Sequence, residues 1–271
     1  MRCDISETGD PRLGDYLRLR DAQLRRHLEA ERGLFIAEGD KIIRRASDAG
    51  CRPRSFLLAE KWLATLADVL EIWPETPCLV AADDLIERVS GFHVHRGALA
   101  SFERPPETSW TPILTGHRVL VCQDLVDHAN IGSVMRVAAA LGWDAVVISP
   151  GCADPLYRRA IKASMGTCFQ VSWRRMRDPV AELAQLRDAG FQLAATTLSP
   201  EAVDLSRYRP PERLALLLGS EGHGLSDDWL ASADVALSIE MASGVDSLNV
   251  ATAAGIFAHA LRYRSGEAQA G

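Results

Sequence analysis

Short apolar runs alternate with helix-like segments along most of this 271-residue chain. In its second half, buried strands are predicted at residues 119–122, 145–148, 192–196, 214–218 and 235–239. Helical patterns at residues 131–141, 179–188 and 227–233 separate them. The first strand, the first helix and the second strand form one βαβ unit. This alternation is typical of an α/β fold, which is the class we predict.

The first part of the chain shows the same alternation on a smaller scale, with predicted strands at residues 34–37, 55–58, 78–80 and 98–100. Residues 15–30 mix leucines with arginines, which predicts an amphipathic helix whose basic side, carrying Arg25 and Arg26, binds RNA or is simply solvated. Three prolines and no periodicity mark residues 104–115 as a linker. We therefore predict a small α/β domain at residues 1–103 and a larger one at residues 116–271.

Composition limits the classes of protein and site. With 47% hydrophobic and 24% charged residues, the chain is long enough to bury a sizeable core. It begins without an apolar signal region, and no apolar run approaches the roughly 18 to 20 residues that span a membrane, so we expect a cytoplasmic protein without a membrane partner. The six cysteines form no C-x-x-C pair, and His223 has no partner at metal-like spacing. We predict neither a disulfide framework nor a metal site.

The chain is acidic overall and basic in one segment. A net charge of -6 gives no global attraction to nucleic acid. Between residues 151 and 178, however, six basic residues outnumber two acidic ones. Arg158, Arg159 and Lys162 in this segment would suit the phosphates of a nucleic acid, and a solvated helix face explains them equally well.

Polar residues follow the predicted strand 119–122, and ligands gather at such strand ends in open α/β sheets. Arg136 lies among apolar neighbours in the next helix, and a guanidinium is seldom buried without a partner or an anionic ligand. An internal ion pair with Asp124 or Asp127 is the structural alternative. Asn130 is either a site residue or a cap of that helix.

A glycine-rich loop and a serine-asparagine pair follow two later strands. Residues 216–226 read LLLGSEGHGLS, an apolar strand running into a loop whose glycines permit close backbone approach to a ligand. The loop lacks the Gly-Lys-Ser/Thr ending of a P-loop and the spacing of a dinucleotide fingerprint. Ser226 is predicted to cap the helix that follows. A plain strand-to-helix turn is the alternative to a ligand-binding loop, although it gives Glu221 no role. Ser247 and Asn249 precede an Ala-rich helix, where they face a site or cap the helix.

Three stretches together resemble, in order and spacing, the three motifs of the SpoU branch of the SPOUT RNA methyltransferases: Asn130 with Arg136, the loop 216–226, and residues 239–249. The resemblance implies a parallel α/β sheet whose C-terminal segment forms a trefoil knot, preceded by a domain that binds the RNA substrate. It also implies a homodimer with sites completed across the interface, structured RNA (tRNA or rRNA) as partner, and S-adenosyl-L-methionine as cofactor. The residues that would hold the cofactor are Thr196, Leu198, Leu218, Gly219, Gly222, Ile239, Met241, Ser247 and Leu248.

The implied reaction is attack of a ribose 2′-hydroxyl on the sulfonium methyl group of the cofactor, which positioning of the two groups accelerates. Proposals for the family give Arg136 the task of general base. Because a guanidinium stays protonated, we assign Arg136 to phosphate binding and to stabilisation of the developing alkoxide, and leave the base open. Asn130, Glu221, Ser247 and Asn249 would orient Arg136 and the substrate.

Two positions depart from the family pattern: His128 and Glu240 each stand where the family usually has proline. A proline would fix φ and remove a donor, so Glu240 could reshape the loop on the adenine side of the cofactor. A non-catalytic RNA-binding or ribosome-assembly factor is the rival hypothesis, and methylation of a base is a second alternative. The presence of Arg136, Glu221 and Asn249 argues against the first, and the Ser-Leu-Asn motif argues against the second.

Overall fold

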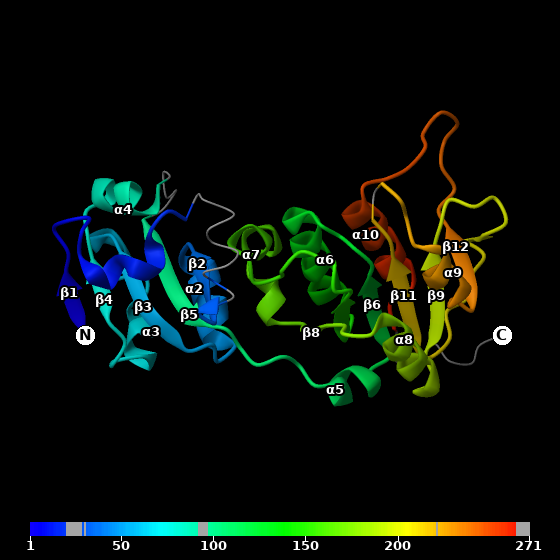
Figure 1. The fold of residues 1–271 in the computed structure, drawn as a ribbon, viewed down its shortest axis with the longest axis horizontal. Helices are drawn as coiled ribbons and strands as arrows, with labels where there is room; N and C mark the ends of the chain where they lie inside the picture. Colours follow the sequence, from blue (N-terminus) through cyan, green and yellow to red (C-terminus); the bar gives the residue numbers. More distant parts are fainter. Residues whose placement is uncertain (20–28, 30, 92–96, 221, 264–271) are drawn as a thin grey trace. The chain divides into compact units, whose positions relative to one another are not determined.

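The computed structural model describes residues 1–19, 29, 31–91, 97–220 and 222–263 (Figure 1). The chain divides into two compact units: Met1–Pro106 with Leu156–Phe169, and Glu107–Pro155 with Gln170–Gly271. Three of the predicted site residues, Arg25, Arg26 and Glu221, lie outside the described residues. Among the described helices, none is both long and apolar enough to cross a membrane.

The first unit is built on a five-stranded mixed sheet in the order β1-β4-β3-β5-β2. β4 pairs in parallel with β1 and β3, whereas β5 pairs antiparallel with β2 and β3. The strands are β1 (Arg2–Asp4), β2 (Leu34–Glu38), β3 (Pro53–Leu58), β4 (Cys78–Val80) and β5 (Ala98–Glu103). The helices are η1 (Pro11–Tyr16), α2 (Asp40–Asp48), η2 (Glu60–Trp62), α3 (Ala67–Ile72), α4 (Asp83–Ser90), α7 (Arg158–Ser164) and η3 (Thr167–Phe169). Although α7 follows a strand of the second unit in sequence, it packs against β2.

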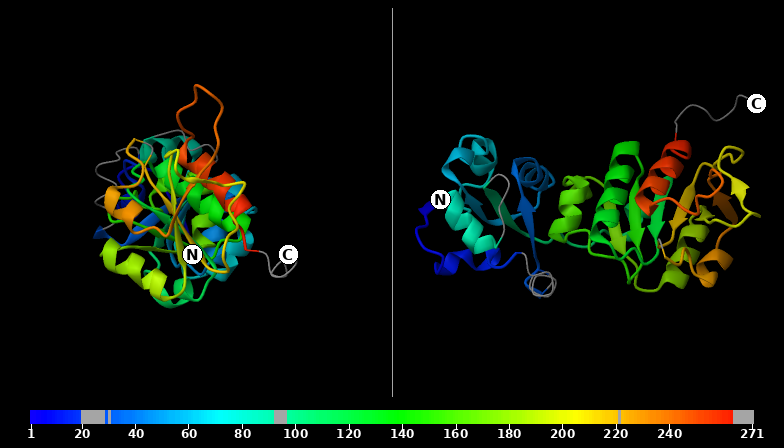
Figure 2. Two further views of the ribbon diagram at one scale, coloured as in Figure 1. Left: turned by 90° about the vertical axis from the view of Figure 1, so that its right-hand side faces the viewer. Right: turned by 90° about the horizontal axis from the view of Figure 1, so that it is seen from above.

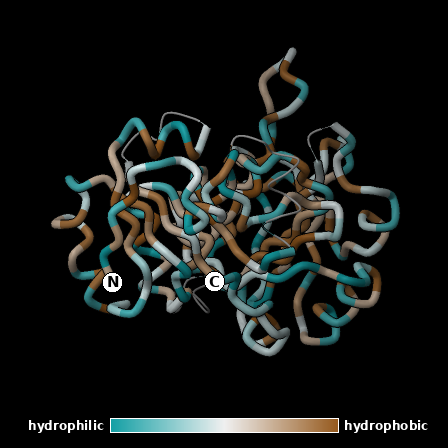
Figure 3. Tube along the Cα trace, turned by 60° about the vertical axis from the view of Figure 1, so that its left-hand side comes forward, coloured by the Kyte–Doolittle hydropathy of each residue, from teal (hydrophilic) through white to brown (hydrophobic). Residues whose placement is uncertain are grey.

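Alternate residues of the first sheet form a core with η1 and α4. Leu34, Ile36 and Leu57 are essentially inaccessible to solvent, and brown segments in Figure 3 mark hydrophobic residues along the chain trace. Tyr16 from η1 is fully buried, donates its hydroxyl hydrogen to the carbonyl of Ser55 at 2.7 Å and accepts from the backbone N–H of Ser101 at 3.2 Å. Burial raises the pKa of Tyr16 because a phenolate would lose its hydration. The phenol therefore fastens η1 to β3 and β5.

The second unit is built on a seven-stranded sheet in the order β10-β12-β9-β11-β6-β7-β8, and every pairing in it is parallel. The strands are β6 (Arg118–Cys122), β7 (Ala145–Ile148), β8 (Ser172–Arg175), β9 (Gln192–Thr196), β10 (Val203–Asp204), β11 (Leu214–Leu218) and β12 (Val235–Ser238). The helices are α5 (Trp110–Leu114), α6 (His128–Leu141), α8 (Pro179–Asp188), α9 (Asp227–Ala231) and α10 (Val250–Ala260). Central strands of such sheets are covered on both faces, which explains their continuous apolar runs.

Helices cover the two faces of this sheet. Val121, Val147 and Leu217 share a core with residues of α5, α8 and α9. Alternate residues of the same strands point to the opposite face, where α6 and α10 pack against each other (Figure 2, right). On that side the indole N–H of Trp143 donates to the carbonyl of Ala258 at 3.0 Å.

The order of the strands creates a switch point between β6 and β11. The chain leaves β6 toward β7 and β8 on one side, and it leaves β11 toward β12 on the other. Loops at the carboxyl ends of two such strands diverge, and the crevice between them is where open α/β sheets bind ligands. Here those loops are residues 123–127 and 219–226, and both carry polar residues singled out from the sequence.

Candidate functional site

The glycine-rich loop after β11 folds back on itself. Ser220 and Gly224 exchange backbone hydrogen bonds of 3.2 and 2.9 Å, and Gly224 has a φ of 66°. A Cβ atom on Gly219 would lie 2.1 Å from the backbone carbon of Gly224, a distance that real Cβ atoms do not adopt. Glycine at 219 is therefore a steric requirement of this tight loop rather than only a source of flexibility.

Gln123, at the end of β6, fastens the far end of that loop. Its side chain accepts from the backbone N–H of Ser226 at 2.9 Å and donates to the Ser226 hydroxyl at 2.8 Å. Ser226 is the N-cap residue of α9, as predicted, but its side chain makes no capping hydrogen bond to the helix. The side chain binds across the switch point instead and ties β6 to the glycine-rich loop.

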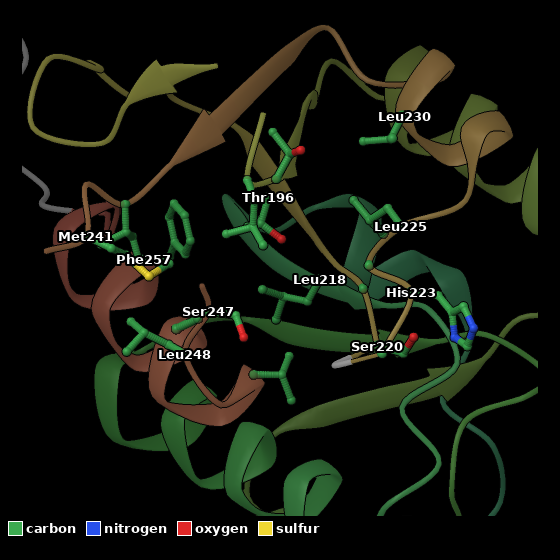
Figure 4. A pocket seen from close by; sticks show the side chains of 18 residues that line it. Thr196, Leu218, Ser220, His223, Leu225, Leu230, Met241, Ser247, Leu248 and Phe257 are labelled. Atoms are coloured by element: carbon green, nitrogen blue, oxygen red, sulfur yellow. The ribbon is translucent and has the colours of Figure 1, made fainter. Parts of the chain in front are cut away.

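A pocket of about 390 Å³ lies between the loops that follow β9, β11 and β12 and the first turns of α10 (Figure 4). All nine residues that the sequence predicted to hold a cofactor line it: Thr196, Leu198, Leu218, Gly219, Gly222, Ile239, Met241, Ser247 and Leu248. They come from four separate segments between residues 196 and 248, so the fold brings them together from a distance. We call this cavity the β9–β11–β12 pocket.

The same pocket has walls that the sequence analysis missed. Val250, Ala253 and Phe257 line it from α10, and Figure 4 shows Phe257 close to Met241. Their spacing of three and four residues is that of one helix face, so helical periodicity could have found them. Thr196 closes the opposite wall, and its hydroxyl donates to the carbonyl of Leu217 on the neighbouring strand at 3.0 Å.

Asn249 and Asn130 meet beside this pocket. Asn249 is the N-cap of α10, and its Oδ1 accepts from the backbone N–H groups of Ala251 and Thr252 at 3.0 and 3.3 Å. Capping fixes the orientation of the amide, so Nδ2 of Asn249 donates to Oδ1 of Asn130 at 3.1 Å. Asn130 is not the cap of α6, because Asp127 holds that position and accepts from the N–H of Ala129. The two asparagines therefore join the starts of α6 and α10.

Arg136 lies elsewhere on α6. It is exposed, and it forms no ion pair with the described residues, so the predicted alternative of an internal pair with Asp124 or Asp127 is wrong. It lies six positions after Asn130, which on a helix turns the two side chains about 120° apart. Within one chain Arg136 does not line the β9–β11–β12 pocket.

Glu240, in place of a family proline, has a structural consequence. The pKa of the Asp204 carboxyl is lowered mainly by hydrogen bonds from the side chain and backbone of Ser206, and also by the backbone N–H of Glu240. A proline has no such donor. The parallel pairing of β10 with β12 holds the start of the loop between β12 and α10 beside β10.

The basic residues of α7 have partners in the first unit. Arg158 and Lys162 both bind the buried carboxylate of Glu38, at 2.9 and 3.0 Å. Arg159 is exposed. Farther along the segment, Arg174 is buried over the ring of Trp110. The local basic excess thus overstates the charge available to a partner, and RNA contact by Arg158, Arg159 and Lys162 stays a prediction.

Within the described part of the chain, no three His, Cys, Asp or Glu side chains gather in a way that could hold a metal ion. None of the six cysteines, all of which lie among the described residues, forms a disulfide, and five of them are buried. Burial raises the pKa of Cys122 and of Cys152, because neither thiolate would be hydrated. The sulfur of Cys152 also accepts from the backbone N–H of Leu125 and donates to the carbonyl of Cys122, both at 3.3 Å.

Known proteins resemble this chain in fold or in sequence. A solved rRNA methyltransferase from Sinorhizobium meliloti with bound AdoMet has a TM-score of 0.80 at 24% identity, over 96% of this chain and 97% of that chain. A tRNA/rRNA methyltransferase of Mycobacterium tuberculosis, itself described as uncharacterized, is 41% identical over 97% of this chain and 92% of its own length. The 23S rRNA (guanosine(2553)-2'-O)-methyltransferase RlmP of Bacillus subtilis is 26% identical over 87% of this chain and 92% of its own length.

Fold and sequence together define the class of the protein, an RNA methyltransferase with a parallel α/β sheet. A more specific match, to the SpoU rRNA Methylase family, covers residues 117–259. The chain belongs to this family. The fold class predicted from the sequence, an α/β domain with a parallel sheet preceded by a smaller α/β unit, is confirmed.

Proposed function

We propose that the protein transfers a methyl group from S-adenosyl-L-methionine to a ribose 2′-hydroxyl of tRNA or rRNA. The observation that carries the proposal is the convergence of nine residues from four segments on the β9–β11–β12 pocket, with the Asn130–Asn249 pair beside it. The 2′-O activity named for the Bacillus subtilis relative supports the choice of ribose over base.

The pocket suits a nucleoside that carries an amino acid. Its volume of about 390 Å³ is within the range of roughly 300–1,000 Å³ typical of small-ligand sites. Leu218, Leu248 and Phe257 offer apolar surface for a base, while the glycine-rich loop offers backbone groups and close approach. Gly219 leaves no room for a Cβ, so the wall of the pocket at this point is backbone alone. S-adenosyl-L-methionine fits these features, and the nine predicted residues would hold it.

When bound, the cofactor supplies an electrophilic methyl group on a positively charged sulfur. The residues of the chain then have two tasks, which are to hold the ribose and to favour loss of the proton from its 2′-hydroxyl. Asn249 and Asn130, fixed to each other and to the start of α10, provide a rigid polar edge for positioning. Arg136 binds a phosphate of the RNA and stabilises negative charge on the attacking oxygen.

Arg136 performs this task across a dimer interface in our proposal. It is exposed on α6 and faces a different direction from Asn130, so a second copy of the chain would have to bring its Arg136 to the site. Exposed Ile256 on the neighbouring helix α10 supports an interface on this side of the unit. The same proposal includes a trefoil knot in the β12–α10 segment and RNA contact through Arg158, Arg159 and Lys162. It also includes participation of Ser247 and Glu221 in the site.

Two measurements test this function. Isothermal titration with S-adenosyl-L-methionine should show binding, and labelled cofactor should methylate RNA from cells that lack the protein. Arg136→Ala should lower kcat/KM for RNA by about 100-fold or more, the typical effect of removing a group that stabilises transition-state charge, and should leave cofactor affinity unchanged. Arg209→Ala is the matched control, because Arg209 is exposed and does not line the β9–β11–β12 pocket.

Loss of cofactor binding in Arg136→Ala would mean that this arginine has a structural role. RNA binding without any transfer by the wild-type protein would favour the non-catalytic RNA-binding factor. Label recovered in a base would instead support base methylation.

A further inference from the structure

A second cavity, of about 540 Å³, lies at the switch point between β6 and β11. Gln123, Asp124 and Val126 line it on the β6 side, and Ser220, His223 and Ser226 line it on the other. The glycine-rich loop separates it from the β9–β11–β12 pocket, since residues 220 and 222–224 line both. Figure 4 shows His223 directed away from Met241 and Phe257. We call this cavity the Asp124 pocket.

Asp124 has an unusual backbone conformation. Its φ is 53°, in the left-handed region that non-glycine residues seldom adopt. Ser149, which is buried, donates its hydroxyl hydrogen to Oδ1 of Asp124 at 2.7 Å and accepts from the backbone N–H of Asp124 at 2.9 Å. A Cβ on Gly151 would lie 2.3 Å from the same Oδ1, so glycine at 151 makes the space for the carboxylate. Backbone strain of this kind clusters at functional sites.

Further hydrogen bonds fix the loop after β7, which positions Asp124. The guanidinium of Arg175 donates to the carbonyls of four residues in the loop after β7, at 2.8 to 3.3 Å: Ser149, Pro150, Cys152 and Ala153. The N–H of Ala153 donates to the carbonyl of Leu125 at 2.8 Å. The loop is therefore rigid, and it fixes the Asp124 carboxylate at the edge of the cavity.

The walls of the Asp124 pocket suit a planar, hydrogen-bonding ligand. Val126 is 69% exposed, which leaves an apolar surface that a ring can cover, and the imidazole of His223 supplies a second flat surface. Gln123 and Ser226 bind each other and fix the floor of the cavity. The carboxylate of Asp124, which only accepts hydrogen bonds when ionised, is the group that can discriminate between ligands.

We infer that the Asp124 pocket binds the base of the nucleotide to be methylated and that Asp124 selects guanine. This inference rests on the proposed RNA methyltransferase function, because the shared loop puts a base in this cavity next to the cofactor pocket. Guanine presents two adjacent donors, N1–H and the 2-amino group. Oδ2 of Asp124 and the remaining lone pair of Oδ1, which also accepts from Ser149, are the acceptors that match them. Enzymes that do chemistry on a base read the Watson–Crick edge of a base taken out of its stack, and on guanine this edge carries both donors.

The other bases fit this acceptor less well. Adenine and cytosine each place a ring-nitrogen acceptor beside their single amino group, and uracil places carbonyls on both sides of its N3–H. Each arrangement sets a lone pair against the carboxylate. A tight loop alone does not require aspartate at 124, because glycine or asparagine adopts this φ as well.

The direct test is the binding of mononucleotides to the protein saturated with S-adenosylhomocysteine. GMP should bind about tenfold more tightly than AMP, CMP or UMP, the lower range for one bidentate contact to a base, and more tightly than IMP, which lacks the 2-amino group. Asp124→Asn should abolish the preference without lowering Tm, because asparagine tolerates the backbone conformation and keeps an oxygen that accepts from Ser149. Asp188→Asn removes an exposed carboxylate outside both pockets and should retain the preference. Absence of a GMP preference, or a preference that survives Asp124→Asn, overturns the inference.

Methyl transfer separates this inference from the proposed function. Label found in 2′-O-methylguanosine, and reduced in Asp124→Asn, supports both. Transfer to the ribose of another nucleoside leaves the proposed function standing and overturns guanine selection. A GMP preference that depends on Asp124 in a protein that transfers no methyl group to RNA supports the base pocket and contradicts the proposed function.

Discussion

Asn249 has two roles, since it caps α10 and also binds Asn130 beside the β9–β11–β12 pocket. Two substitutions separate these roles. Asn249→Ala removes both the cap of α10 and the hydrogen bond to Asn130. Asn249→Asp keeps an oxygen that accepts from Ala251 and Thr252, and its charge is favourable at a helix N-terminus. It replaces the donor that faces Oδ1 of Asn130, however, so two acceptors would meet at about the 3.1 Å of the present hydrogen bond. Asn130 can restore a bond only by turning its amide over, which reverses the polarity of its outer end.

The magnitudes follow from these contacts. Loss of a helix cap costs about 1 kcal/mol, and loss of a hydrogen bond costs about 0.5–1.5 kcal/mol, so Asn249→Ala should lower the free energy of unfolding by about 1.5–2.5 kcal/mol. Asn249→Asp should change it by less than about 0.5 kcal/mol, since the cap remains and the helix dipole offsets part of the lost bond. Both variants should lose most of the methyl transfer, because both change the polar edge that positions the ribose.

Urea unfolding and single-turnover methylation of RNA measure the two effects separately. Asp178→Ala is the matched control: Asp178 caps α8 by accepting from the N–H of Ala181 at 3.2 Å and lines neither pocket. It should lose about 1 kcal/mol of stability and keep full transfer. If Asn249→Asp is as active as the wild type, the contact with Asn130 has no part in the reaction and our assignment of this pair is wrong.

Three further predictions concern the pocket wall, the anchor of α10 and the thiols. Gly219→Ala should abolish cofactor binding in a titration and cost about 1–3 kcal/mol of stability, because its Cβ would collide with the backbone of the loop; unchanged affinity would contradict the steric argument. Arg118→Met should lower the free energy of unfolding by about 3 kcal/mol, because this buried guanidinium donates to four backbone carbonyls, one of them at the end of α10. A urea midpoint equal to that of the wild type would show that these contacts contribute nothing to stability. Near neutral pH a thiol reagent should modify Cys3 but not Cys152 in the native protein, because a raised pKa removes the reactive thiolate at that pH; mass mapping that finds Cys152 labelled would refute this.

The strands and helices of the second unit could be predicted from the sequence where the strands are buried on both faces. Predicted strands at 192–196 and 214–218 coincide with β9 and β11, and the predicted helix 179–188 coincides with α8. β8 was missed, because Ser-Trp-Arg-Arg at an edge of the sheet reads as a basic surface. Its arginines instead bind backbone carbonyls and the ring of Trp110, contacts that depend on the tertiary fold.

Local pattern was less informative about the direction of side chains in the site. Arg136 was expected to be buried because its sequence neighbours are apolar, yet it is exposed. Helix α6 packs against both the sheet and α10, so apolar residues surround most of its circumference and the pattern does not reveal the remaining face. The contact between Asn130 and Asn249 joins residues 119 positions apart, and no periodicity encodes such a contact.

The central claim is that this chain methylates the ribose of an RNA. The most direct measurement incubates the purified protein with labelled S-adenosyl-L-methionine and RNA from cells that lack it, digests the RNA to nucleosides and separates them. Our account predicts label in a 2′-O-methylated nucleoside, and none with Arg136→Ala. Label in a base, or no label with a protein that binds the cofactor and the RNA, would contradict it.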